Sequence, residues 1–316
     1  WLRETFTDAV WLRLRADVPV GSCLSGGLDS SAIVCVAHDL LRESGSPGQC
    51  TYSACSRDPR FDERRWAEAV ADHTQVDARF LYPESEGFFE TLPDLVWHHD
   101  EPFDSHGIYA YWRMMEQVRS DGMKVILNGQ GADEQLGGYA PFLGARLAGL
   151  LRRGQWGMFA REVRKVFRSQ NRTTTELAMR AVDGLLPEVV RQGLRQWTGN
   201  ISARPDWFNW QRLGAEPQDP FLKMGARKGE VRNLSLKQLS GGNFQMLLHY
   251  EDRLAMAHSV EVRVPFLDYR LVEGITGLPE AFNGLCSVTK PLPFLVRCSR
   301  PVTTSPRVSR APPSEA

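Results

Sequence analysis

The feature that most constrains this chain is an apolar run, residues 18–24, that meets two glycines and then gives way to an amphipathic pattern. This order predicts a strand, a tight loop and a helix. Such a loop binds anions, because Gly26 and Gly27 let backbone N–H groups approach a phosphate and the following helix presents its positive end. We therefore expect a phosphate site at residues 24–31.

The same loop supplies hydroxyl donors and one carboxylate. A carboxylate repels phosphate unless a divalent metal lies between them, so Asp29 is a candidate Mg²⁺ ligand. The alternative is that Asp29 caps the helix and that the serines are turn residues. The chain lacks the Gly-x4-Gly-Lys-Ser/Thr string of a Walker A loop. The candidate nucleotide-binding residues of the loop are Leu24, Ser25, Gly26, Gly27, Asp29, Ser30 and Ser31.

Apolar and amphipathic stretches continue to alternate after the loop. Strands are expected at 51–55, 78–82 and 124–127, with helical patterns between them. This alternation predicts an α/β fold with a doubly wound parallel sheet, whose ligands bind at the carboxyl ends of the strands. From about residue 141 the pattern becomes helical, and we expect additional carboxyl-terminal helices over 141–283.

A second glycine-rich stretch follows the strand predicted at 124–127. Gly129 and Gly131 suit a loop that approaches a ligand closely, and are nucleotide-binding candidates. Asp133 can supply a second oxygen to the metal, while Glu134 can ligate it, pair with a cation or orient substrate. The alternative is a glycine-rich turn with exposed acids.

Composition narrows the function classes. The 38 Lys and Arg balance the 38 Asp and Glu, so no overall field favours nucleic acid or an anionic membrane. No apolar run approaches the roughly 20 residues that span a bilayer, and residues 1–5 lack the apolar core of a signal peptide. The six cysteines include no Cys-x-x-Cys pair, which argues against structural zinc. We expect a cytoplasmic protein that binds neither nucleic acid nor membrane.

A third stretch, residues 246–268, is helical in its first half and extended in its second. Its ionic groups lie among apolar residues, which implies that they are paired. The motifs in chain order are Ser25-Gly-Gly-Leu-Asp-Ser-Ser31, Gly129-Gln-Gly-Ala-Asp-Glu134 with Gly137-Gly-Tyr139, and Tyr250-Glu-Asp-Arg253 through Val264-Pro-Phe-Leu-Asp268. Together they resemble the synthetase domain of glutamine-dependent asparagine synthetases and their relatives, including β-lactam synthetases and lasso-peptide cyclases.

The resemblance implies an adenine nucleotide α-hydrolase-like (ATP pyrophosphatase) fold. It places a synthetase domain over 1–283; the composition of residues 284–316, where the family pattern fails, predicts an irregular or disordered tail. It also implies ATP- and Mg²⁺-dependent amide formation. A carboxylate, most often aspartate, attacks ATP to give an acyl-adenylate of the β-aspartyl-AMP type and pyrophosphate, and ammonia then displaces AMP.

Residue roles carry over motif by motif. By resemblance, the loop from Ser25 to Ser30 holds the pyrophosphate, and Asp29 and Asp133 hold Mg²⁺. The backbone around Ala54 is expected to lie near the adenine. Lys290 stands where the family has its pyrophosphate-binding lysine. The catalytic candidates are Asp29, Gln130, Asp133, Glu134 and Lys290.

Four departures from the family pattern matter. No glutaminase domain precedes the loop, so this chain alone is expected to use free ammonia or another amine, with any glutaminase separate or missing. Gln130 replaces the family's glutamate and cannot act as a general base, which leaves the acyl acceptor open although aspartate is the first candidate. Pro291 and Pro293 interrupt the helix expected after Lys290, and residues 297–316 lack periodicity.

Two other functions fit the sequence. One is a tailoring amidotransferase or cyclase that acts on another carboxylate. The other is a truncated, inactive remnant that binds nucleotide, which the irregular tail favours. The presence of both Asp29 and Asp133 favours an enzyme. Transfer-RNA thiolation by a related pyrophosphatase is disfavoured, because the chain has no paired cysteines.

Overall fold

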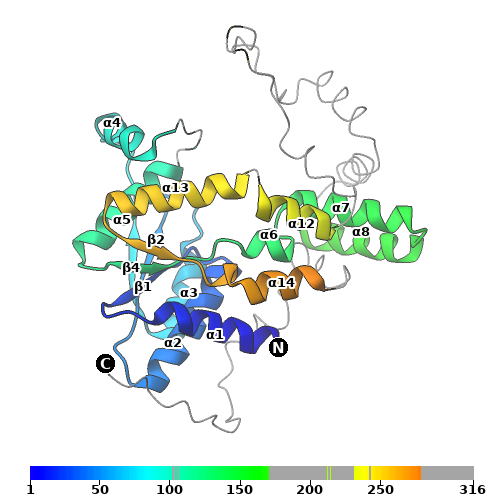
Figure 1. Cartoon of the computed structure of the whole chain (residues 1–316), viewed down its shortest axis with the longest axis horizontal. Helices are drawn as coiled ribbons and strands as arrows, with labels where there is room; N and C mark the ends of the chain where they lie inside the picture. Colours follow the sequence, from blue (N-terminus) through cyan, green and yellow to red (C-terminus); the bar gives the residue numbers. More distant parts are fainter. Residues whose placement is uncertain are drawn as a thin grey trace.

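Strand β1 (Val20–Cys23) lies at the centre of a five-stranded sheet in the computed structural model of this chain (Figure 1). The structure describes residues 1–101, 103, 105, 107–170, 212, 214, 231–241 and 243–278. Its helices and strands are, in chain order, α1 (Leu2–Leu14), β1 (Val20–Cys23), α2 (Leu28–Ser44), β2 (Cys50–Ala54), α3 (Arg64–Thr74), β3 (Asp77–Leu81), α4 (Phe88–His99), α5 (Gly107–Ser120), β4 (Val125–Leu127), α6 (Ala132–Leu136), α7 (Ala140–Arg152), α8 (Trp156–Gln170), α12 (Val231–Ser240), α13 (Asn243–Ala257), β5 (Glu261–Arg263), the 3₁₀ turn η1 (Pro265–Leu267) and α14 (Tyr269–Gly277).

The sheet is wound in both directions from its centre. The strand order is β3-β2-β1-β4-β5, and every neighbouring pair is parallel. Cys23 lies opposite Tyr52 on one side, and Ser22 lies opposite Leu127 on the other. Because the strand order reverses between β1 and β4, the loops that leave these two strands meet at the topological switch point. The predicted doubly wound α/β fold is confirmed.

Helices cover both faces of the sheet. On one face α1 and α2 pack together, with Phe6, Ile33 and Leu127 in a shared core. On the other face α5 packs over β2 and α13 packs over β5, with Tyr52 and Met115 in the core. Figure 1 shows α13 running along the face opposite α1 and α2. None of the helices in the described ranges is both long and apolar enough to cross a membrane.

The predicted strands at 51–55 and 78–82 are β2 and β3, each displaced by one residue. The extended second half of the third stretch contains β5, so the span 141–283 is not purely helical. This short strand pairs with β4 and places α13 beside the switch point. The predicted boundary at residue 283, the tail over 284–316 and Lys290 lie outside the described residues.

Candidate active site

The nucleotide loop connects β1 to α2 and fits closely against α3. Gly26 has a φ of +81°, and a Cβ on this residue would lie 2.7 Å from both the backbone nitrogen of Ala67 and the Cβ of Trp66. Glycine is therefore required at this position by the left-handed backbone and by the first turn of α3. Leu24, a candidate nucleotide-binding residue, is instead fully buried, and its backbone is engaged within the sheet: its nitrogen donates to the Tyr52 carbonyl and its carbonyl accepts from Ser53 Oγ.

The serines of the loop stabilise its conformation. Ser25 Oγ accepts a hydrogen bond from the Gly27 backbone nitrogen at 3.2 Å, and the Ser30 and Ser31 hydroxyls both donate to the Gly27 carbonyl. The serines therefore stabilise the turn, as the alternative interpretation expected. Asp29 does not cap the helix, because the N-cap of α2 is Gly27 and no side chain caps it.

The loop after β4 touches the nucleotide loop. A Cβ on Gly129 would lie 3.2 Å from the Ser30 backbone nitrogen and 3.3 Å from the Asp29 Cβ. Gly131 has a φ of +91°, and a Cβ on this residue would lie 2.4 Å from Leu267 Cδ2, so Gly129 is tightly enclosed and Gly131 has no room for a larger residue. The two glycine-rich loops predicted from sequence therefore meet as one site, as the strand order requires.

Three carboxylates gather where the loops meet. The pKa of Asp29 is raised to about 7, first by burial and then by the neighbouring charges of Asp133 and Glu134. Burial also raises the pKa values of Asp133 and Glu134. None of the three forms an ion pair with another described residue. The cluster thus holds negative charge that a cation would stabilise.

Glu134 is fixed on two sides within this cluster. Its Oε1 accepts a hydrogen bond from the Tyr139 hydroxyl at 2.8 Å, and its backbone carbonyl accepts one from Ser235 Oγ at 2.6 Å. Only 2% of Glu134 is exposed, and its Oε2 is buried without a hydrogen-bond partner among the described residues. Helix α12, which carries Ser235, is therefore part of the frame of the site.

The donor set suits Mg²⁺ that arrives with phosphate. Within the described part of the chain, no group of three His, Cys, Asp or Glu side chains is placed to hold a metal ion together. Mg²⁺ commonly takes one or two protein carboxylates and completes its shell with phosphate oxygens and waters. Asp29 and Asp133, from the first turns of α2 and α6, fit that requirement.

Gln130 donates a hydrogen bond to a fourth carboxylate, that of Glu251, which the sequence analysis did not identify as a site residue. Glu251 on α13 accepts hydrogen bonds at its Oε1 from Asn128 Nδ2 and Gln130 Nε2, both at 2.8 Å. Burial raises the pKa of Glu251 to about 7, against the lowering effect of these two hydrogen bonds. Glu251 stood inside the third sequence motif, and the neutral Gln130 was the signal that an acid had to be sought elsewhere.

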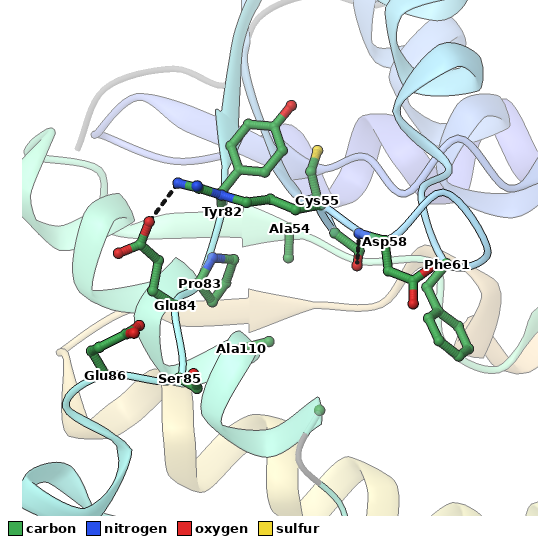
Figure 2. Close-up of a pocket in the computed structure, with 13 residues that line it drawn as sticks. Ala54, Cys55, Asp58, Phe61, Tyr82, Pro83, Glu84, Ser85, Glu86 and Ala110 are labelled. Atoms are coloured by element: carbon green, nitrogen blue, oxygen red, sulfur yellow. Dashed lines mark hydrogen bonds and ion pairs between the residues drawn. The ribbon is translucent and has the colours of Figure 1, made fainter.

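A pocket of about 770 Å³ opens at the carboxyl ends of β2 and β3 (Figure 2). Ala54, expected near the adenine, lines it, and in Figure 2 Tyr82 and Phe61 lie on either side of this residue. Arg57 and Glu84, which also line the pocket, form an ion pair at 2.5 Å. The lining combines the rings of Phe61 and Tyr82 with polar and charged side chains such as Asp58, a mixture that suits a small polar molecule with one flat apolar part.

The chain matches the asparagine synthase family over residues 1–292. Amidase chyE of Penicillium rubens is 25% identical over 312 residues, covering 89% of this chain and 46% of that protein. Asparagine synthetase [glutamine-hydrolyzing] 1 of Bacillus subtilis is 26% identical over 311 residues, covering 92% of this chain and 45% of that protein. Asparagine synthetase [glutamine-hydrolyzing] of Zea mays is 35% identical over 149 residues, which is 45% of this chain and 25% of that protein.

The chain spans about half the length of the first two of these relatives. The family match covers the nucleotide loop, the second glycine-rich loop, α13 and Lys290. It agrees with the doubly wound parallel sheet described above and with the resemblance carried by the three sequence motifs. The chain belongs to the asparagine synthase family.

Proposed function

We propose that this chain catalyses ATP- and Mg²⁺-dependent amide formation through an acyl-adenylate, releasing AMP and pyrophosphate. The observation that carries the proposal is the meeting of Asp29 and Asp133 at the switch point, beside a glycine-rich loop at a helix start. Carboxylates in a phosphate loop require a cation between them and the phosphates. Membership of the asparagine synthase family supports the same reaction class.

The residues present fit definite roles in this reaction. The backbone of the nucleotide loop and the start of α2 would hold the phosphates. Asp29 and Asp133 would hold Mg²⁺, which when bound neutralises charge on the departing pyrophosphate. Tyr139 keeps Glu134 oriented toward this cluster through its 2.8 Å hydrogen bond. The pocket that contains Ala54 would take the nucleoside end of ATP.

The substrates follow from the reaction class. A small carboxylate is the acyl donor, with aspartate the first to test, and ammonia is the nitrogen source, either free or delivered by a glutaminase partner. A second candidate is amide formation on a different carboxylate. It is favoured by the neutral Gln130 and by the relative that carries the name amidase.

The test is pyrophosphate release by the chain with ATP, Mg²⁺, ammonium and aspartate. Asp29→Asn should abolish Mg²⁺-dependent release, lowering it by about 100-fold or more, because the phosphates would lose a metal ligand. The matched control is Asp39→Asn on the same helix, where Asp39 forms a surface ion pair with Arg42. Equal losses in the two variants, or no Mg²⁺-dependent ATP binding by the parent chain, would overturn the proposal.

A further inference from the structure

Glu251 is held in an unusual way for a buried carboxylate. Its Oε1 takes both available hydrogen bonds, from Asn128 and Gln130, while its Oε2 is sealed from solvent and has no partner among the described residues. A buried acceptor without a donor costs free energy, so its retention needs an explanation. The orphan oxygen is the one that a reacting group can use.

Glu251 also lies beside the carboxylate cluster of the site. The charge of Glu134 acts on Glu251, and the charges of Glu134 and Asp133 act on Asp29. Glu251 forms no ion pair within the described ranges, so no cation of that part of the chain weakens its affinity for a proton. A carboxylate in such surroundings is a suitable proton acceptor near neutral pH.

We propose that Glu251 is the catalytic base of the amide-forming step, in place of a glutamate at position 130. This inference rests on the proposed function. As the nitrogen nucleophile attacks, the C–N bond forms, the bond between the acyl carbon and the AMP oxygen breaks, and AMP leaves as the phosphate anion. The proton released from nitrogen goes to Oε2 of Glu251.

Asn128 and Gln130 act as positioning residues for this base. Both amide groups donate to Oε1, which fixes the plane of the carboxylate and leaves Oε2 for the nucleophile. A glutamate at residue 130 would place a second carboxylate against the first, and the two could not both be ionised. Positions 130 and 251 therefore form a unit that carries one negative charge.

The first experiment separates the two half-reactions. Aspartate and a panel of other amino and hydroxy carboxylic acids are screened for ATP–pyrophosphate exchange, which reports adenylation without a nitrogen source. With the best acid, Glu251→Gln should leave exchange within about 3-fold and lower amide formation with ammonium by about 100-fold or more. The matched control is Asp252→Asn, which removes the neighbouring, exposed carboxylate of α13.

The second experiment moves the carboxylate from position 251 to position 130. Gln130→Glu alone should lower amide formation, because one of two adjacent carboxylates is then protonated. The double variant Gln130→Glu with Glu251→Gln keeps one carboxylate and one amide, and should recover at least about tenfold over Glu251→Gln.

The outcomes distinguish the two proposals. Exchange that Asp29→Asn abolishes, with amide formation unchanged in Glu251→Gln, overturns the role of Glu251 and leaves the proposed function standing. Equal losses of exchange and amide formation in Glu251→Gln, with no recovery in the double variant, show a structural role and also overturn it. Absence of exchange with every acid overturns the proposed function and the inference together.

Discussion

The Asp133 carboxylate lies directly over the α-carbon of Gly138. A Cβ on Gly138 would stand 1.6 Å from Asp133 Oδ1, and the backbone nitrogen of Gly138 donates to the Asp133 carbonyl at 2.9 Å. The turn after α6 therefore folds back on the metal candidate, whose carboxylate occupies the space that a side chain on Gly138 would need. No substitution at Gly138 can leave that carboxylate where it is.

Gly138→Ala is expected to displace Asp133 and to weaken Mg²⁺ binding in the presence of ATP by about tenfold or more, since an outer partner of a ligand commonly contributes this much. Titration calorimetry or Mn²⁺ spectroscopy measures the affinity directly. Gly157→Ala is the control, because a Cβ on that residue of α8 meets nothing within 4 Å. Unchanged metal affinity in Gly138→Ala would argue against Asp133 as a ligand.

Gly26→Ala is expected to lower the free energy of unfolding by about 2–4 kcal/mol and to abolish ATP binding. The variant combines a positive φ with overlap against the Ala67 backbone, which cannot move aside as a side chain can. Gly45→Ala separates the two causes, since Gly45 has a φ of +66° and open space around it. Gly45→Ala should cost only about 1 kcal/mol in urea denaturation and leave ATP binding intact.

The two glycine-rich loops could be predicted from sequence because each is specified locally. A strand, a glycine pair and a helix start can each be predicted from about ten consecutive residues. The parallel order of the strands then brings both loops to one edge of the sheet. The sequence therefore predicts that Asp29 and Asp133 lie close together in the fold, although they are 104 residues apart in the chain. The roles assigned to them and to Glu134 stay predictions.

Glu251 could not be found in this way, because its partners are 121 and 123 residues away and no local pattern joins them. What brings α13 to the loop is the pairing of β5 with β4. The sequence predicts an extended segment at the end of the third stretch, but not the strand with which that segment pairs. Side-chain pairing across such a distance depends on the packing of the whole sheet, which sequence patterns do not encode.

Glu251→Gln is expected to stabilise the fold at alkaline pH. Burial raises the pKa of Glu251 from an ordinary value of 4.5 to about 7, so between these values the folded chain binds more protons than the unfolded chain. Stability attributable to Glu251 therefore falls as pH rises through this window and stays low above it. The variant should gain about 1–3 kcal/mol in unfolding free energy at pH 8 and little at pH 4.

Chemical denaturation in Mg²⁺-free buffer at the two pH values measures this difference. Asp252→Asn, which alters an exposed carboxylate one residue along α13, should show no comparable gain. A gain of equal size at pH 4 and pH 8 would mean that the stability effect comes from packing and not from the buried charge.

Asp268→Asn is expected to act in the opposite direction with pH. The side chain is 4% exposed, caps α14, and accepts hydrogen bonds from Arg270 Nε at 2.9 Å and from Arg13 Nη1 at 2.6 Å. Arg270 first, and Arg13 after it, hold the pKa of this carboxyl well below its ordinary value of 3.8. The stability that Asp268 contributes is thus fully present above pH 3.8 and is lost as pH falls below it.

Replacing Asp268 with Asn leaves two guanidinium groups without their shared carboxylate and loosens α1 from α14. We expect a loss of about 2–4 kcal/mol in unfolding free energy at pH 7 and a somewhat smaller loss at pH 3, where the unfolded chain has begun to bind the proton, measured by urea denaturation. Asp39→Asn breaks a surface pair with an N–O distance of 3.5 Å and should cost under about 1 kcal/mol. If Asp268→Asn cost no more than Asp39→Asn at pH 7, the contact between α1 and α14 would have to be ascribed to apolar packing alone.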